Sequence, residues 1–189
     1  MKHGRAVLDK RWAPFPNLYL VGFMGTGKSA VGRRIAERFK LKFIDSDSEI
    51  EKAQGMSIKE IFAKFGEEKF REMEREFIES GHPENGCVVS CGGGLVCREG
   101  MPELVKSRGI AVVLFADPEV IYKRVCLSKT RPLLNVPDPK GRICELLQAR
   151  KDFYMKSGIC VSSSGGVEEV EERVARIYAD RVKKMRKSK

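Results

Sequence analysis

The stretch that restricts this chain most is residues 22–29, which read G-x-x-x-x-G-K-S. An apolar run at 18–21 precedes it, and a helical pattern with Val31, Ile35 and Phe39 on one side follows it. In this order of strand, glycine loop and helix, the motif binds phosphate through backbone N–H groups and the helix N-terminus. The alternative is a glycine-rich turn that matches by chance, but all eight positions fit. We therefore interpret the stretch as a nucleotide-binding loop.

Two side chains of this loop have chemical tasks of their own. Lys28 can reach the β- and γ-phosphates of a nucleotide, and the hydroxyl of Ser29 can ligate Mg²⁺. A phosphate loop alone fixes neither the reaction nor a second substrate, so the rest of the chain has to supply both.

The length and composition indicate one globular domain. A chain of 189 residues is long enough to bury a sizeable core. Apolar residues make up 42% of it, yet no apolar run approaches the roughly 20 residues of a membrane span. Residues 1–16 are interrupted by charges and lack the long apolar stretch of a signal peptide. We expect a soluble, cytoplasmic protein without a membrane partner.

The net charge of +10 is concentrated at the two ends of the chain. Residues 1–16 contribute +3 and residues 181–189 contribute +6. Solvated or disordered ends are the usual explanation for such runs, so we expect no nucleic-acid function. The predicted organisation is a basic N-terminal extension at 1–16, one domain at 17–180 and a basic C-terminal tail at 181–189.

Six cysteines and two histidines raise the question of disulfides or a zinc site. No C-x-x-C spacing occurs, and several cysteines lie in apolar runs, where cysteine behaves as a small hydrophobic residue. We expect neither a disulfide framework nor a metal site built from thiolates.

Short apolar runs alternate with helical patterns along the chain. Such strands, most of them short and apolar rather than alternating, favour an α/β fold in which helices cover both faces of a five-stranded parallel sheet, in three layers. Gly66 separates two helical stretches, and residues 128–141 are predicted to be a long surface loop. The predicted strands are 18–21, 41–44, 87–91, 110–115 and 159–162. One predicted helix follows the phosphate loop, another begins at Asp117-Pro118, and a last one lies between Val167 and Ile177. The other predicted helices span 58–65, 67–80, 102–107 and 142–156.

Three polar or glycine-rich segments follow predicted strands directly, at 22–29, 45–47 and 92–94. Ligands of parallel α/β sheets bind at the carboxyl ends of the strands. We therefore expect these three segments to converge on one rim of the sheet.

Taken together in this order, the motifs make the chain resemble the shikimate kinase family over roughly residues 17–180. The resemblance implies a P-loop kinase fold with a mobile lid at about 128–138, ATP as co-substrate and Mg²⁺ as cofactor. It implies a monomer that phosphorylates the 3-hydroxyl of shikimate on the route to chorismate and the aromatic amino acids. The matching pieces are 22–29, Asp45-Ser46-Asp47, Phe70-Arg71 with Glu74, Gly92-Gly93-Gly94, Arg131-Pro132-Leu133, and Arg150 before Tyr154.

The same resemblance assigns roles to residues. It implies Lys28, Asp47 and Arg131 as catalytic residues. The residues implied for ATP binding are Gly25, Thr26, Gly27, Lys28, Ser29, Ala30, Arg124 and Arg131. Those implied for shikimate are Asp47, Arg71, Gly92, Gly93, Gly94, Arg150, Phe62 and Phe70. Ser29 would hold Mg²⁺ directly, and Asp45 and Ser90 would do so through water.

The chemistry of shikimate agrees with these assignments. Its carboxylate binds best to planar, bidentate donors, and arginines such as Arg71 and Arg150 are donors of this kind. Glu74 lies three residues after Arg71 and would orient it on one helix. Asp47 can accept the proton of the reacting hydroxyl, and Arg131 on the lid would close over the γ-phosphate. The alternatives are solvated surface arginines, an Asx turn after the strand, and simple core positions for Phe62 and Phe70.

Two features depart from the family pattern. Residue 152 is aspartate where many members have proline, and the loop 163–166 lacks a basic residue often found beside adenine. The alternatives to the main interpretation are another small-molecule P-loop kinase, such as a gluconate kinase, and a non-catalytic nucleotide-binding descendant. The Asp-x-Asp element and the two arginines disfavour the first, and the presence of Lys28, Asp47 and Arg131 disfavours the second.

Overall fold

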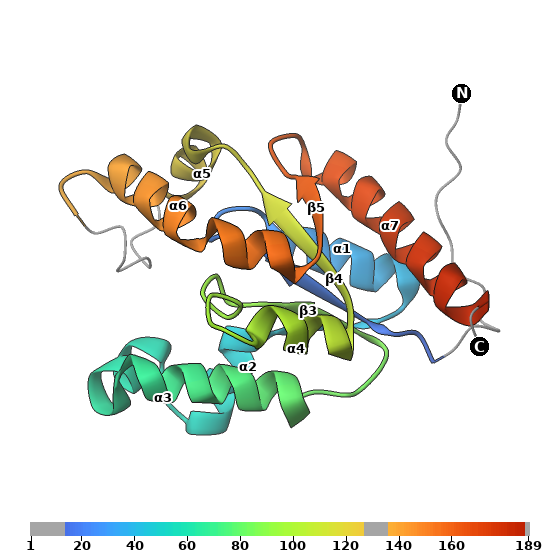
Figure 1. Ribbon diagram of the computed structural model, residues 1–189, viewed down its shortest axis with the longest axis horizontal. Coiled ribbons are helices and arrows are strands. Elements are labelled where there is room, and N and C mark those ends of the chain that lie inside the picture. Colours follow the sequence, from blue (N-terminus) through green and yellow to red (C-terminus); the bar gives the residue numbers. More distant parts are fainter. Residues whose placement is uncertain (1–13, 127–135, 188–189) are drawn as a thin grey trace.

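A computed structural model describes residues 14–126 and 136–187 (Figure 1). Its centre is a parallel sheet of five strands in the order β2-β3-β1-β4-β5, which confirms the predicted sheet. Because β1 lies in the middle, the loop that follows it emerges between its neighbours β3 and β4. The strands are β1 (Asn17–Val21), β2 (Lys42–Asp45), β3 (Cys87–Ser90), β4 (Gly109–Phe115) and β5 (Ile159–Ser162).

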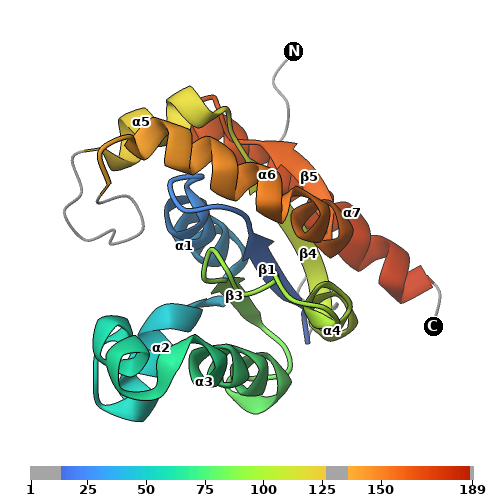
Figure 2. The same ribbon diagram turned by 60° about the vertical axis from the view of Figure 1, so that its left-hand side comes forward.

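Helices cover both faces of the sheet, which gives the predicted three layers (Figure 2). Successive side chains of β1 point to opposite faces, as in any strand. Leu18 and Leu20 therefore pack with α1 (Lys28–Phe39) and α7 (Val167–Lys187) on one face. Tyr19 and Val21 pack on the other face with α3 to α6. These helices are α3 (Ile58–Ser80), α4 (Met101–Arg108), α5 (Pro118–Val125) and α6 (Pro139–Ser157).

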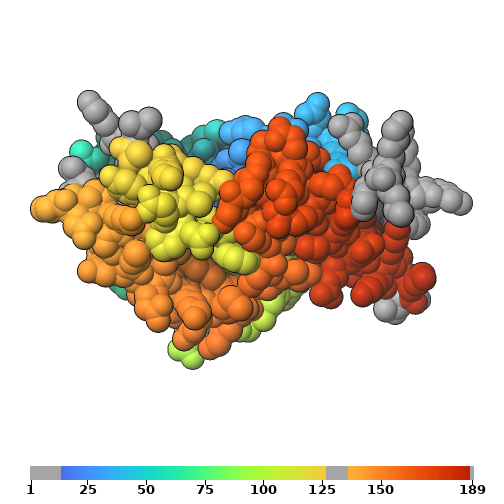
Figure 3. Space-filling model, turned by 90° about the horizontal axis from the view of Figure 1, so that it is seen from above, coloured from blue at the N-terminus to red at the C-terminus, as the bar shows by residue number. Residues whose placement is uncertain are grey.

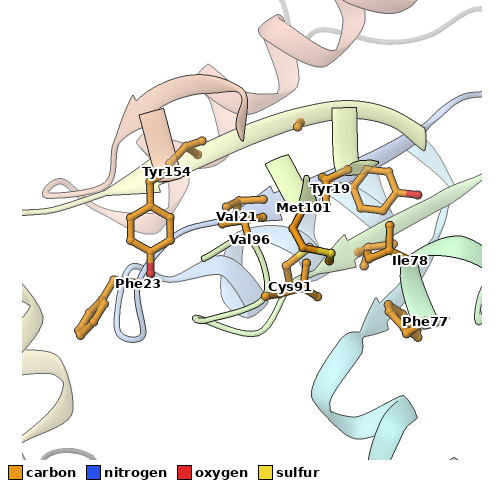
Figure 4. Close-up of a cluster of buried hydrophobic side chains, with 14 of the residues drawn as sticks. Tyr19, Val21, Phe23, Phe77, Ile78, Cys91, Val96, Met101 and Tyr154 are labelled. Carbon is orange, nitrogen blue, oxygen red and sulfur yellow. The ribbon is translucent and has the colours of Figure 1, made fainter. Parts of the chain in front are cut away.

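The core on this second face joins distant parts of the chain. Figure 4 shows Tyr19 of β1, Phe77 and Ile78 of α3, Met101 of α4 and Tyr154 of α6 within one cluster. Each of them is at most 7% exposed. Seen from above, α5, α6 and α7 form one continuous surface (Figure 3).

Local sequence signals place several helix ends correctly. Ser57 and Glu60 form a capping box at the start of α3, where a helix was predicted to begin at residue 58. Gly66 has φ 80° and ψ 174° and interrupts that helix, as predicted. Asp117-Pro118 opens α5 with proline in the first turn.

Three boundaries differ from the predictions. A short helix, α2 (Ser46–Gln54), follows β2 directly and was not predicted, because its run of acidic residues has little apolar periodicity. The predicted loop 128–141 is wrong at its end, since α6 begins at Pro139 with Asp138 as its cap. This cap repeats the Asp-Pro signal of α5. The α7 helix continues through the predicted boundary at 180/181, because Val182 is still buried in the core.

The first described residues also pack on the domain rather than extending from it. Gly86 N donates to Phe15 O at 2.7 Å, and the Tyr178 hydroxyl donates to Pro16 O at 2.7 Å. No helix in the described part of the chain combines the length and apolar character needed to cross a membrane.

Candidate active site

The phosphate loop leaves β1 at Gly22, a position that only glycine can occupy. Its φ of 137° is unfavourable for other residues, and an added Cβ would collide with Leu114 O of β4. Gly27, at φ 89°, caps α1 without any side-chain hydrogen bond. The N-terminus of α1 therefore lacks a side-chain cap of its own, and a phosphate can supply one.

Lys28 is folded onto the loop that it follows. Its Nζ donates to Gly22 O at 2.8 Å and to Phe23 O at 2.9 Å, and only 8% of the residue is exposed. The Thr26 hydroxyl donates to the same Phe23 carbonyl at 2.7 Å. The ammonium is thus held inside the loop in which phosphate oxygens would lie.

Three oxygen-bearing side chains meet beside the loop, and they are the ones that the resemblance assigned to Mg²⁺. The Ser29 hydroxyl donates to Asp45 Oδ2 at 3.1 Å and lies 3.1 Å from Ser90 Oγ. In residues 14–126 and 136–187, no group of three or more His, Cys, Asp or Glu side chains is arranged to hold a metal ion. A single carboxylate with two hydroxyls suits Mg²⁺, which takes oxygen ligands and usually completes its shell with phosphates and water.

Asp47 lies in the first turn of α2, facing the end of β3. Burial raises the pKa of its carboxyl, and the neighbouring Asp45 raises it further, whereas Lys28 lowers it. Ser46, which was not predicted as a site residue, is fully buried and donates to Asp47 Oδ1 at 3.4 Å. The Ser46 hydroxyl also accepts from Gly92 N at 2.8 Å and so ties α2 to the glycine segment. The sequence feature that could have identified Ser46 is its position between two aspartates, directly after a predicted strand.

Arg71 projects from α3 between two glutamates. Its Nη1 donates to Glu74 Oε2 at 2.7 Å and its Nη2 donates to Glu67 Oε1 at 2.8 Å. The predicted neighbour Glu74 is therefore in place, and Glu67 adds a second partner. Burial raises the pKa of Glu74 to about 7, although Arg71 acts in the opposite direction.

The glycine segment 92–94 makes room for these side chains. A Cβ on Gly92 would collide with Asp47 Oδ1, and one on Gly94 would lie 2.7 Å from Arg71 Nη1. The resemblance assigned Gly92, Gly93 and Gly94 to shikimate binding. In the structure, Gly92 and Gly94 let Asp47 and Arg71 lie against the backbone.

Arg150 reaches the same segment from α6. Its Nη1 donates to Gly93 O at 3.4 Å, and its guanidinium lies 5.8 Å from the ring centre of Phe23. Tyr154, one turn further along α6, donates to Gly93 O at 2.6 Å. The aspartate at 152 in place of proline leaves Arg150 directed at the site.

Two phenylalanines lie beside Arg71. The Phe62 and Phe70 rings are 4.9 Å apart, and the Arg71 guanidinium lies 5.5 Å from the Phe70 ring centre. Phe70 is 4% exposed and belongs to the core, so its direct effect is to support Arg71.

Arg124 links the phosphate loop to the loop after β5. Its guanidinium donates to Gly25 O at 3.3 Å, to Ser163 O at 2.8 Å and to Gly165 O at 3.3 Å. Arg131 and most of the predicted lid at about 128–138 lie outside the described residues.

The three segments predicted to meet do line one cleft of about 470 Å³. Arg71 and Arg150 flank it through their contacts with Gly94 and Gly93. Met24 and Cys91 also line the cleft and were not predicted; burial raises the pKa of the Cys91 thiol, which keeps it protonated. The lining residues are Met24, Gly25, Gly27, Lys28, Ser29, Ala30, Asp45, Asp47, Ser90, Cys91, Gly92, Gly93 and Arg124.

A parallel α/β sheet, a phosphate loop after its central strand and a second polar site facing that loop define a P-loop kinase of small molecules. The model of the shikimate kinase family matches residues 24–182. The chain belongs to the shikimate kinase family.

Individual relatives agree with this assignment. The chain is 43% identical to a shikimate kinase from Thermodesulfovibrio yellowstonii, an alignment that covers 86% of this chain and 94% of the relative. A solved shikimate kinase from Acinetobacter baumannii, in complex with shikimate, superposes with a TM-score of 0.78 at 34% identity. That match covers 95% of this chain and 97% of the other. A gluconokinase from Sinorhizobium meliloti superposes with a TM-score of 0.59 at 18% identity. That match covers 89% of this chain and 93% of the gluconokinase, and it shows a shared fold alone.

Proposed function

We propose that this protein transfers the γ-phosphoryl group of ATP to the 3-hydroxyl of shikimate, giving shikimate 3-phosphate and ADP on the route to chorismate. The family supports the reaction, and one observation carries the choice of acceptor. A carboxylate, Asp47, lies across the cleft from the phosphate loop, and two arginines from different helices flank the glycine segment beside it.

The donor half would bind the nucleotide through the phosphate loop. Loop N–H groups, the N-terminus of α1 and Lys28 would neutralise the β- and γ-oxygens. Gly25, Thr26, Gly27 and Ala30 would contribute backbone contacts. Arg124 would stack on adenine, because it already spans the gap between the phosphate loop and the loop 163–166.

The oxygens of Ser29, Asp45 and Ser90 fit Mg²⁺, with Ser29 as direct ligand and the other two acting through water. When bound, the ion supplies positive charge to the phosphate oxygens and draws the phosphates into alignment.

The acceptor half would hold shikimate by its carboxylate. Arg71 and Arg150 offer planar donor pairs, and the salt bridges of Arg71 to Glu67 and Glu74 fix its orientation before substrate arrives. Asp47 would accept the proton of the 3-hydroxyl. Its raised pKa strengthens it as a base while Lys28 still favours the ionised form.

Three further assignments complete the proposal. Arg131, on a lid at about 128–138, would close over the γ-phosphate and exclude water, which limits hydrolysis of ATP. Phe62 and Phe70 would form the apolar wall of the shikimate pocket. Residues 17–180 would act as one catalytic domain of a cytoplasmic monomer without a nucleic-acid partner.

The runner-up acceptor, gluconate, also carries a carboxylate, and the gluconokinase from Sinorhizobium meliloti shares its fold with this chain. Gluconate is a flexible open chain, so it should fit a flat glycine segment beside two fixed arginines less well than the ring of shikimate does. A non-catalytic descendant has no reason to retain both Lys28 and a buried Asp47.

A coupled ADP-release assay tests the function, with ATP, Mg²⁺ and either shikimate or gluconate in parallel reactions. We expect ADP release that depends on shikimate, stops when EDTA removes Mg²⁺, and stays at background with gluconate. Equal rates with gluconate, or no release with shikimate, would contradict the proposal.

A further inference from the structure

The carbonyl oxygen of Gly93 is the acceptor for three side chains. The Tyr154 hydroxyl donates to it at 2.6 Å, Arg150 Nη1 at 3.4 Å and the Cys97 thiol at 3.9 Å. Gly93 itself lines the cleft. A single backbone carbonyl therefore joins α6 to the glycine segment 92–94, which would contact the acceptor substrate.

The hydroxyl of Tyr154 is the dominant partner of this carbonyl. Its bond is the shortest of the three, and Tyr154 is 7% exposed, with its ring pointing from α6 into the buried cluster of Figure 4. Burial raises the pKa of Tyr154 far above its usual range, so the phenol keeps its proton and can donate at neutral pH.

Arg150 and Tyr154 are four residues apart and share one face of α6. At 3.4 Å, the bond from Arg150 to Gly93 O is long and weak. The carbonyl is thus satisfied mainly by Tyr154, and the Arg150 guanidinium can give its hydrogen bonds to a ligand carboxylate. Without the hydroxyl, Arg150 would become the main donor to this half-buried acceptor and would be drawn toward the backbone.

We propose that Tyr154 is a positioning residue for carboxylate recognition, which keeps Arg150 available by satisfying Gly93 O. This inference rests on the proposed function and adds a residue to it. The Tyr154 hydroxyl donates to the glycine segment 92–94, so its effect should fall on the acceptor substrate.

A second buried tyrosine provides a matched control. Tyr178 of α7 also donates its hydroxyl to a backbone carbonyl, Pro16 O, at 2.7 Å, and it is fully buried on the opposite face of the sheet. Tyr178→Phe removes the same kind of hydrogen bond, and therefore reports the purely structural cost of losing a buried phenol.

The experiment compares Tyr154→Phe, Tyr178→Phe, Arg150→Ala and the double variant Tyr154→Phe/Arg150→Ala by steady-state kinetics. Tyr154→Phe should raise the KM for shikimate about fivefold to tenfold, the typical effect of one neutral hydrogen bond, with the KM for ATP unchanged. Tyr178→Phe should change neither KM. In the Arg150→Ala background, the further change Tyr154→Phe should have little effect, because the residue that it positions is already gone.

Several results would overturn the inference. They are equal KM values for the two phenylalanine variants, a matching rise in the KM for ATP, or an undiminished effect of Tyr154→Phe in the absence of Arg150. Thermal unfolding of the two single variants checks that both are folded. Wild-type protein in the same assay separates the two claims: no turnover of shikimate would refute the proposed function, whereas turnover with a silent Tyr154→Phe would refute only the role of Tyr154.

Discussion

The two halves of the cleft are built in opposite ways. The half proposed to bind ATP is local: residues 22–29 are contiguous, run from the end of β1 into the start of α1, and take their backbone conformation from glycines. The half proposed to bind shikimate brings together Asp47 from α2, Arg71 from α3, the glycine segment 92–94 and Arg150 from α6.

This difference determines what each half is sensitive to. A backbone loop tolerates changes in its surroundings as long as its own glycines and Lys28 are kept. An acceptor site built from side chains depends on the contacts between elements, such as Ser46 with Gly92 and Arg71 with Glu74. Mutations in the acceptor half should therefore affect shikimate and spare ATP.

The largest effect is expected for Asp47→Asn. Loss of a general base costs about 10²- to 10⁴-fold in rate, so kcat should fall by that factor while the dissociation constant of ATP is retained. Glu49→Gln, on the same helix, is the matched control, because Glu49 pairs only with the exposed Lys52 among the described salt bridges. A fully active Asp47→Asn enzyme would remove the role of this residue as base, and a loss of ATP affinity would break the separation of the halves.

Arg71→Ala should weaken shikimate binding next most strongly. Removing one partner of a desolvated charge pair costs about 2–5 kcal/mol, or about 30-fold to a few thousandfold in the dissociation constant. Calorimetric titration with shikimate and with ATP measures the two halves separately. Arg75→Ala, one turn further along α3 in an exposed pair with Glu79, should bind both like wild type. If shikimate affinity survives in Arg71→Ala, the carboxylate does not bind there.

Gly92→Ala tests how closely the acceptor half is packed. The added Cβ would meet Asp47 Oδ1 and displace the carboxylate, and misplacement of a reacting group by about 1 Å can cost on the order of 100-fold. We expect a fall in kcat/KM for shikimate of about 10- to 100-fold. Gly93→Ala should cost less, because its Cβ would lie 3.3 Å from its nearest neighbour, Met24 N. The reverse ranking would show that Asp47 moves aside freely.

Much of this arrangement could be predicted from the sequence, and the donor half most completely. Its residues are contiguous, so a single motif with its flanking strand and helix specifies the geometry. The five strands were also predictable, because most of them are short apolar runs. Boundaries set by polar residues, as in α2, could not be read from apolar periodicity.

For the acceptor half, the sequence predicted individual residues but not how they are arranged. The resemblance to a family identified Asp47, Arg71 and Arg150, but spacing alone cannot bring together residues from three helices. Ser46 and Glu67 act through hydrogen bonds across these elements, and no local pattern marks such a role.

The smallest expected effect is a change of stability with pH, and it comes from Glu74 in the acceptor half. Glu74 has an ordinary pKa of 4.5 when unfolded and about 7 when folded, because burial disfavours its charge. The folded state therefore binds the proton more tightly, and this stabilisation is complete below pH 4.5 and is lost as the pH rises through 7. Relative to Glu74→Gln, the wild type should lose on the order of 1–3 kcal/mol of unfolding free energy over that window.

Urea unfolding of both proteins between these pH values checks this prediction. Parallel stability curves would mean that Glu74 titrates normally and that the acceptor half is less desolvated than its burial indicates.

We propose that the two halves form one site, which presents the 3-hydroxyl of shikimate to the γ-phosphate of ATP. ¹H–³¹P correlation NMR of the product formed by the wild-type protein from shikimate, ATP and Mg²⁺ measures this directly. We expect a single phosphorylated product whose phosphorus couples to the proton on carbon 3. Phosphate on another hydroxyl, or ADP accompanied only by inorganic phosphate, would contradict it.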